Sequence, residues 1–145
     1  MPHFELTTII NKPLQVTFAY FVDREQFPQW RSGIVEVEAL EGDATSKGSQ
    51  HRLTLQENGP AVSLVEVVTD CRKDELVSYT IDHPSVCTTS TTSFEAIGNS
   101  TKVTTEVNLT LKSLLWKALG GMIRKDAQQR YELEYQTLKE LVEND

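Results

Sequence analysis

The chain has 145 residues, of which 39% are hydrophobic and 24% charged, and its formal net charge is −7. A domain of this length hides about 70% of the surface of its unfolded chain, so it can form a core without disulfides or metals. We therefore expect a single domain over residues 1–145. The acidic balance argues against nucleic acid as a partner, because the protein's field would repel a phosphate backbone.

Targeting signals and metal motifs are not evident in the sequence. No apolar run approaches the roughly 20 residues that a membrane-spanning helix needs. Residues 1–6 lack the basic and apolar pattern of a signal peptide, so we expect a cytoplasmic location. Cys71 and Cys87 form no CxxC pair, which argues against a zinc site and a disulfide framework. We expect reduced thiols, no metal and no cofactor.

A strand and a short apolar helix open the chain. Residues 4–10 alternate loosely between apolar and polar side chains, which predicts a β-strand. Pro13 suits the first position of a helix, where its missing N–H costs no hydrogen bond. Val16, Ala19 and Tyr20 then recur at helical spacing, which predicts a short amphipathic helix.

The residues after this helix predict a second short turn. We expect Asp23 to cap a turn over residues 24–27 and Pro28 to end it. Trp30 is expected to close one end of the core, with one polar contact for its indole N–H. The aromatic residues of this region that we expect in the core are Phe18, Tyr20, Phe21 and Trp30.

Six further segments have the pattern of β-strands and are separated by short polar turns. They cover residues 34–40, 51–55, 61–71, 76–82, 86–97 and 101–111. Strands joined by such short loops form an antiparallel meander, and the first strand brings the predicted total to seven.

The last segment has the pattern of a long helix. From residue 113 to residue 142, apolar side chains recur in steps of three and four. Gly120 and Gly121 interrupt this pattern. A glycine pair costs a helix roughly 2 kcal/mol relative to alanines, so we expect a kink or a close approach there.

This order of elements resembles the START-like superfamily, also called SRPBCC or Bet v 1-like, and within it a small bacterial branch named for polyketide cyclases and dehydrases. The resemblance is carried by "IINKPLQVTFAYFVDREQFPQW" (residues 9–30) and by "GNSTKVTTEV" (residues 98–107). It implies an α+β helix-grip fold. In this fold a seven-stranded curved antiparallel sheet surrounds a long C-terminal helix, two short helices follow the first strand, and a cavity lies between sheet and helix.

Several polar residues share a strand face with apolar ones, which is how small-molecule sites are usually built. His51 shares its face with Leu53, and the hydroxyls of residues 88–92 share theirs with Phe94. Ser63 shares its face with Val65. A one-residue bulge would turn any of these sets outward. The candidate cavity-lining residues are His51, Leu53, Ser63, Val65, Tyr79, Thr88, Ser90, Thr92, Phe94, Leu119, Met122, Ile123 and Tyr131.

We therefore expect a protein that binds a small hydrophobic or amphipathic molecule, lipid-like or polyketide-like, in this cavity. Burial of apolar ligand surface would supply about 25 cal/mol per Å², less ordering costs. His51, the inward hydroxyls, and Tyr79 or Tyr131 would orient the ligand. The resemblance leaves two alternatives open. One is a cyclase, aromatase or dehydratase with His51 as its acid/base group, and the other is a protein-interaction module. A monomer and a homodimer are both compatible with the sequence.

Two local patterns admit a functional and a structural interpretation. "DHPSVC" brings Asp82, His83 and Cys87 together, as in a nucleophile site or simply in a turn at a strand end. "LKSLLWKALGGMIRK" (residues 111–125) combines four basic residues with an apolar face. It predicts contact with an anionic membrane surface or, as the simpler interpretation, a helix that grips the sheet with solvated lysines.

Overall fold

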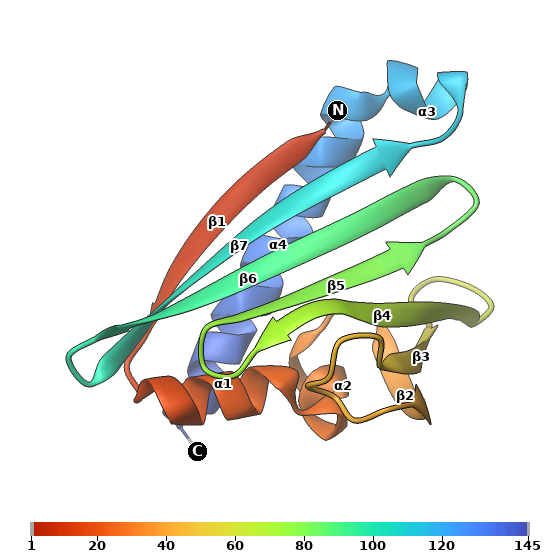
Figure 1. The fold of residues 1–145 in the computed structure, drawn as a ribbon. Coiled ribbons are helices and arrows are strands. Elements are labelled where there is room, and N and C mark those ends of the chain that lie inside the picture. The colour runs from red at the N-terminus through yellow and green to blue at the C-terminus, as the bar shows by residue number, and fades with distance from the viewer. Residues whose placement is uncertain (1, 145) are drawn as a thin grey trace.

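The computed structural model describes residues 2–144 and contains a seven-stranded sheet with a long C-terminal helix (Figure 1). The strands are β1 (His3–Ile10), β2 (Ile34–Glu41), β3 (Gln50–Leu55), β4 (Val62–Arg72), β5 (Leu76–Asp82), β6 (Val86–Ile97) and β7 (Ser100–Leu111). The helices are α1 (Leu14–Val22), the 3-10 turn η1 (Arg24–Gln26), α2 (Phe27–Trp30), α3 (Leu114–Ala118) and α4 (Gly120–Glu143).

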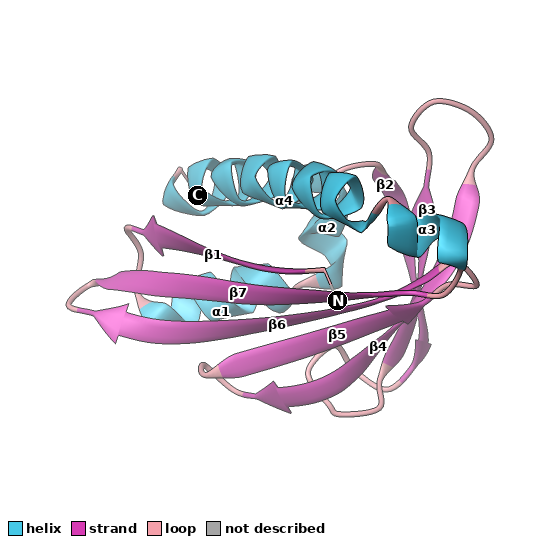
Figure 2. Ribbon diagram, turned by 90° about the horizontal axis from the view of Figure 1, so that it is seen from above, coloured by secondary structure: helices cyan, strands magenta, loops and turns pink. Residues whose placement is uncertain are grey.

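The sheet has the order β1-β7-β6-β5-β4-β3-β2, and every neighbouring pair is antiparallel. Strands β2 to β7 are therefore a meander, and only β1 pairs out of sequence order, with β7. The sheet curves, and α4 lies across its concave side (Figure 2). The predicted helix-grip architecture is confirmed.

The short helices lie at the end of the sheet where α4 finishes (Figure 1). Helix α1 buries Thr17, Phe18, Phe21 and Val22, which share one face because they are one, three and four residues apart. Asp23 caps η1 as predicted, since its Oδ1 accepts a hydrogen bond from the Glu25 N–H at 3.0 Å.

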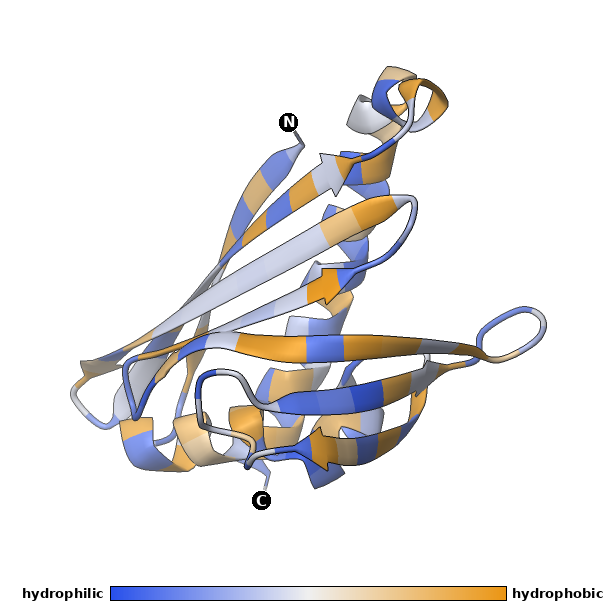
Figure 3. Ribbon diagram, turned by 45° about the vertical axis from the view of Figure 1, so that its right-hand side comes forward, coloured by the Kyte–Doolittle hydropathy of each residue, from blue (hydrophilic) through white to orange (hydrophobic). Residues whose placement is uncertain are grey.

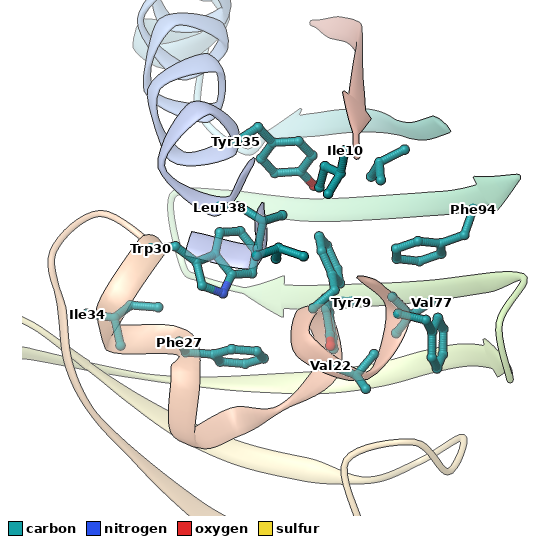
Figure 4. Close-up of a cluster of buried hydrophobic side chains, with 14 of the residues drawn as sticks. Ile10, Val22, Phe27, Trp30, Ile34, Val77, Tyr79, Phe94, Tyr135 and Leu138 are labelled. Atoms are coloured by element: carbon teal, nitrogen blue, oxygen red, sulfur yellow. The ribbon is translucent and has the colours of Figure 1, made fainter. Parts of the chain in front are cut away.

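The expected role of Pro28 was wrong. Pro28 does not end the turn but lies in the first turn of α2, where a missing N–H is tolerated. Helix α2 therefore brings both Phe27 and Trp30 into the core. The Trp30 ring lies 5.1 Å from Phe21 and 5.9 Å from Tyr135, between centroids. Figure 4 shows the Trp30 and Tyr135 rings between α2, α4 and the sheet. Such aromatic pairs add about 0.5–1.5 kcal/mol each beyond the area they bury.

The C-terminal segment forms two helices rather than the single helix expected. The break falls at Leu119, next to the glycine pair. A Cβ atom on Gly120 would lie 3.5 Å from both Leu111 and Pro2, an ordinary van der Waals distance, so the pair marks a break in the helix rather than a close approach. Beyond the break, α4 buries Tyr135, Leu138 and Val142 against the sheet. The cavity described below lies against the part of α4 between this break and Tyr135.

Candidate ligand-binding site

A cavity of about 350 Å³ lies between the sheet and the first half of α4. Ligand cavities are typically about 300–1,000 Å³, so it has room for a small molecule. Most of its wall is apolar and comes from β3 to β7. The polar groups come mainly from the loop after α2 and from α4, and His83 and Thr88 add two from the β5–β6 turn and β6. The lining residues are Arg31, Ser32, Ile34, Leu53, Leu55, Leu64, Ile81, His83, Val86, Thr88, Leu109, Ala127, Arg130, Tyr131 and Glu134.

The inner end of this cavity is built around a buried ion pair. Arg31, which follows α2, donates from Nη1 and Nη2 to the two carboxylate oxygens of Glu66 on β4, at 2.9 and 2.8 Å. The guanidinium also lies over the Phe27 ring, 4.7 Å from its centroid. Burial would raise the pKa of Glu66, but Arg31 and then His51 outweigh burial and hold it well below its ordinary value. Glu66 is therefore a carboxylate in the core.

His51 completes this network instead of facing the cavity. Its Nδ1 accepts a hydrogen bond from Arg24 Nε at 3.2 Å, and its Nε2 lies 2.7 Å from Glu66 Oε1. An arginine N–H can only donate, so the ring proton is assigned to Nε2, which donates to Glu66. His51 is 1% exposed and lines neither this cavity nor the smaller one beside it. The expectation that His51 lines the site and contacts a ligand is corrected: it holds Glu66 in place.

Glu134 is the carboxyl group that does line the cavity. Its Oε2 accepts a hydrogen bond from the Ser32 backbone N–H at 3.0 Å, which joins α4 to the loop after α2. Burial raises the pKa of Glu134, and nearby Arg31 only partly offsets this effect. A buried carboxyl with a raised pKa next to an arginine is a candidate for recognising or protonating a ligand.

The outer end of the cavity is bridged by a second ion pair. Arg130 of α4 donates from Nη1 and Nη2 to the two oxygens of Glu57, in the loop between β3 and β4, at 2.6 and 3.0 Å. Both side chains are partly exposed, so this pair contributes at most about 1 kcal/mol. Such a weak contact can open without unfolding the sheet.

A second, smaller chamber of about 20 Å³ lies beyond Arg31. It shares Arg31, Tyr131 and Glu134 with the larger cavity. Its lining residues are Phe21, Trp30, Arg31, Tyr79, Ser90, Tyr131, Glu134 and Tyr135. The volume is enough for one water-sized group, for which about 10–15 Å³ suffices.

Two residues that line this chamber each carry a buried polar atom without a hydrogen-bond partner within residues 2–144: Trp30 at Nε1 and Tyr79 at Oη. A third such atom, Ser49 Oγ, belongs to a residue outside the chamber. Both side chains are buried (Figure 4). A buried polar group without a partner costs about 1–3 kcal/mol, so native proteins rarely leave two beside one chamber. The polar contact expected for the Trp30 indole is therefore not made by the protein.

Hydroxyl groups on β6 connect the sheet to α4. Ser90 Oγ lies 2.9 Å from Tyr131 Oη, and Thr92 Oγ1 lies 3.3 Å from Tyr135 Oη and 2.8 Å from Thr105 Oγ1. Burial raises the pKa of Tyr131 to about 12, so its hydroxyl keeps its proton at neutral pH. The inward face of β6 expected from the sequence is thus present, but Thr92 bonds to protein rather than facing a cavity.

The remaining expected residues on the sheet divide into two groups. Leu53 and Thr88 line the larger cavity, and Phe94 is in the core. Ser63 and Val65, by contrast, are exposed on the outer face of β4, so the expectation that they line the cavity is corrected. The register pairs Leu53 with Leu64 and His51 with Glu66, which turns the even-numbered residues of β4 inward.

The expectation that residues in the first part of the C-terminal segment line the cavity is also corrected. Leu119 and Met122 are exposed, Met122 by 70%, and neither lines the cavity. Ile123 is partly buried and packs against a small cluster that includes Phe4. Of the helix residues expected to line the site, only Tyr131 does so.

The "DHPSVC" segment is a turn. His83 Nδ1 accepts a hydrogen bond from the Ser85 backbone N–H at 3.0 Å, and Asp82 pairs with Lys112. Cys87 lies opposite Asp82 in the β5–β6 ladder. Residues 2–144 also contain no group of three side chains placed to hold a metal.

Arg31, Glu66 and Glu134 were missed in the sequence analysis. The sequence pattern contained a partial indication for two of them. Glu134 lies three residues after Tyr131 and four before Leu138, on the inward face of the helix. Glu66 alternates with Leu64 and Val68 on β4. A charged residue in such a position is ordinarily assigned to the surface, so the buried partner that reverses the assignment had to come from the structure.

A curved antiparallel sheet around a long helix, with a cavity between them, defines a START-like, or Bet v 1-like, protein. The chain belongs to the family described as "Polyketide cyclase / dehydrase and lipid transport", whose model matches residues 1–143. No curated protein matches the sequence closely enough to count as a relative. The helices of residues 2–144 include none that is long and apolar enough to cross a membrane.

Solved structures with the same fold have distant sequences. Ara h 8.0201 shares 19% identity with a TM-score of 0.82, over 99% of this chain and 98% of that one. A START superfamily protein from Mycobacterium smegmatis shares 18% identity with a TM-score of 0.80, over 98% and 97% of the two chains. The Zhui aromatase/cyclase from Streptomyces shares 13% identity with a TM-score of 0.80, over 97% and 93%. At these identities the likeness establishes the fold alone.

The buried network yields a stability prediction. Replacing Glu66 by Gln removes the carboxylate that pairs with the largely buried Arg31, so the free energy of unfolding at neutral pH should fall by about 3–5 kcal/mol. The folded-state pKa of Glu66 is lowered from 4.5 to about 2. Its contribution is therefore present above pH 4.5 and lost as pH falls through this window, so the gap between wild type and Glu66→Gln should narrow on acidification. Urea unfolding followed by circular dichroism measures both effects.

Glu38→Gln is the matched control, because Glu38 forms an exposed pair with Arg52 at 2.6 Å. This substitution should lower the free energy of unfolding by less than about 1 kcal/mol. Equal losses in the two variants would contradict the structural role assigned to Glu66.

Proposed function

We propose that the whole chain acts as one ligand-binding domain that takes a small hydrophobic or amphipathic molecule between the sheet and α4. The observation that carries this proposal is the mostly apolar cavity of about 350 Å³, with Arg31, Ser32 and Glu134 together at its inner end. Family membership supports a lipid-like or polyketide-like ligand, since the family is described by cyclases, dehydrases and lipid transport.

The inner end of the site supports a finer proposal about the ligand. Trp30 Nε1 can only donate a hydrogen bond, and Tyr79 Oη can donate or accept one. A chamber of about 20 Å³ beside them fits a single oxygen atom but not a ring. We infer that the ligand carries a terminal oxygen, such as a carbonyl or phenol, that enters this chamber past Arg31 while its apolar body fills the larger cavity.

Catalysis has less support than binding. The acid/base group expected from the sequence, His51, is buried between Arg24 and Glu66 and lines neither of the two cavities described above. Glu134 lines the cavity and has a raised pKa, so it is the residue on which an enzymatic role would rest. Its hydrogen bond from Ser32 gives it an equally sufficient structural role.

Filling the cavity should weaken ligand binding. Ala127 lines the cavity from α4, so Ala127→Phe places a ring where the ligand's apolar body would lie. Titration with the fluorescent fatty acid parinaric acid should show affinity reduced at least about tenfold, equivalent to 1.4 kcal/mol. Ala96→Phe adds the same ring at an exposed position of β6 and should bind like wild type. Equal affinity in wild type and Ala127→Phe would argue against this site.

The oxygen-binding chamber is tested by a pair of matched competitors. β-Naphthol and β-methylnaphthalene have nearly the same shape, and only the first carries an oxygen. Displacement of parinaric acid should favour naphthol by about fivefold, the value of one net hydrogen bond. Tyr79→Phe should reduce this preference, while its unfolding free energy stays unchanged or rises because an unpartnered hydroxyl is removed.

Tyr20→Phe removes a hydroxyl from a side chain that lines neither cavity and should retain the preference. The inference about the oxygen would be wrong if both competitors displaced the probe equally from the wild-type protein, even with the cavity itself intact.

A further inference from the structure

The segment between β7 and the buried part of α4 exposes an unusual amount of apolar surface. Its exposed side chains, which we call the apolar cap, are Leu114, Leu115, Trp116, Leu119 and Met122. Leu114 is 86% exposed and Met122 is 70% exposed. In Figure 3, the hydrophobic colour marks α3 where it projects beyond the end of the sheet. Single exposed apolar residues are common on protein surfaces, but five large ones close together indicate a surface that contacts a partner.

The charge around the apolar cap is opposite to that of the rest of the chain. Residues 107–125 contain no Asp or Glu but include Lys112, Lys117, Arg124 and Lys125. The other residues carry ten of the 14 basic side chains and all 21 acidic ones. A basic and apolar surface on an acidic protein is complementary to a partner that is both anionic and apolar.

The apolar cap lies at the same end of the molecule as the turn between β5 and β6 (Figure 1). The Lys112 N–H, just before α3, donates to the Ser85 carbonyl in that turn at 3.0 Å. The adjacent residues His83 and Val86 line the larger cavity, as does Ala127 a turn beyond the apolar cap. A surface that bound the apolar cap would therefore lie beside the cavity.

We propose that α3 and the first turn of α4 dock this protein onto the surface of an anionic lipid bilayer. Leu114, Leu115 and Met122 enter the interface between headgroups and acyl chains. Lys117, Arg124 and Lys125 contact lipid phosphates, while Lys112 stays paired with Asp82. A bilayer surface accounts for both features at once, because it offers negative charge above an apolar layer. Docking does not require a bound ligand, so this proposal stands apart from the function proposed above.

Vesicle flotation at low salt tests the proposal. The full chain should float with phosphatidylcholine vesicles that contain phosphatidylserine, and much less with phosphatidylcholine alone. Leu115→Glu and Lys117→Glu should each reduce the bound fraction roughly tenfold or more, and added salt should weaken wild-type binding. Matched controls are Leu133→Glu, at an exposed position of α4, and Lys102→Glu, at an exposed position of β7, and both should float like wild type.

Circular dichroism and thermal unfolding of each variant separate lost docking from lost folding. The proposal is overturned if wild type does not float with anionic vesicles, or if the two controls lose as much binding as the apolar-cap variants. It is also overturned if light scattering shows a dimer that Leu115→Glu dissociates, because the apolar cap would then be an interface between two copies of the chain.

Discussion

The buried ion pair between Arg31 and Glu66 is the constraint on which the arrangement of the site depends. Two charges can remain in a protein interior only when they neutralise each other and their hydrogen bonds are satisfied. Glu66 meets this condition with both Arg31 and His51, and His51 is in turn held by Arg24. These contacts join η1 and the residue after α2 to β3 and β4, so the short helices cannot shift along the sheet without exposing a charge to an apolar core.

This arrangement separates polar groups that maintain the fold from polar groups that are available to a ligand. Hydroxyls on β6 and β7 are used by tyrosines of α4, and His51 is used by Glu66. Trp30 Nε1 and Tyr79 Oη have no such partner within residues 2–144. Trp30 and Tyr79 both line one small chamber, and that contrast is why the chamber, rather than the histidine, supports the proposed recognition of an oxygen.

The architecture could be predicted from the sequence because it depends on periodic patterns and local turn residues. The apolar alternation in seven strands and the three-and-four spacing near Tyr135 and Leu138 are both one-dimensional signals. The site was harder to predict because it depends on which residues are paired in space. On β4, both faces carry apolar residues, and only the buried partner of Glu66 decides that Leu64 faces inward while Val65 faces out.

The apolar stripe of the C-terminal helix was misassigned for a related reason. Periodicity identifies an apolar face but does not tell what covers it, and the segment before Ile123 extends past the end of the sheet. Leu119 and Met122 continue the same pattern as Leu138, yet they lie outside while Leu138 is in the core. The glycine pair was the local indication, since it marks the place where the chain changes direction.

A double-mutant cycle between Arg31 and Glu66 tests the central claim most directly. Arg31→Met, Glu66→Leu and the double variant are compared with wild type by urea unfolding. Each single variant strands a buried charge and should cost about 3–5 kcal/mol, while the double variant strands none and should cost no more than either single variant. Losses that simply add in the double variant would show that the two residues act independently, and would contradict the view that their pairing organises the site.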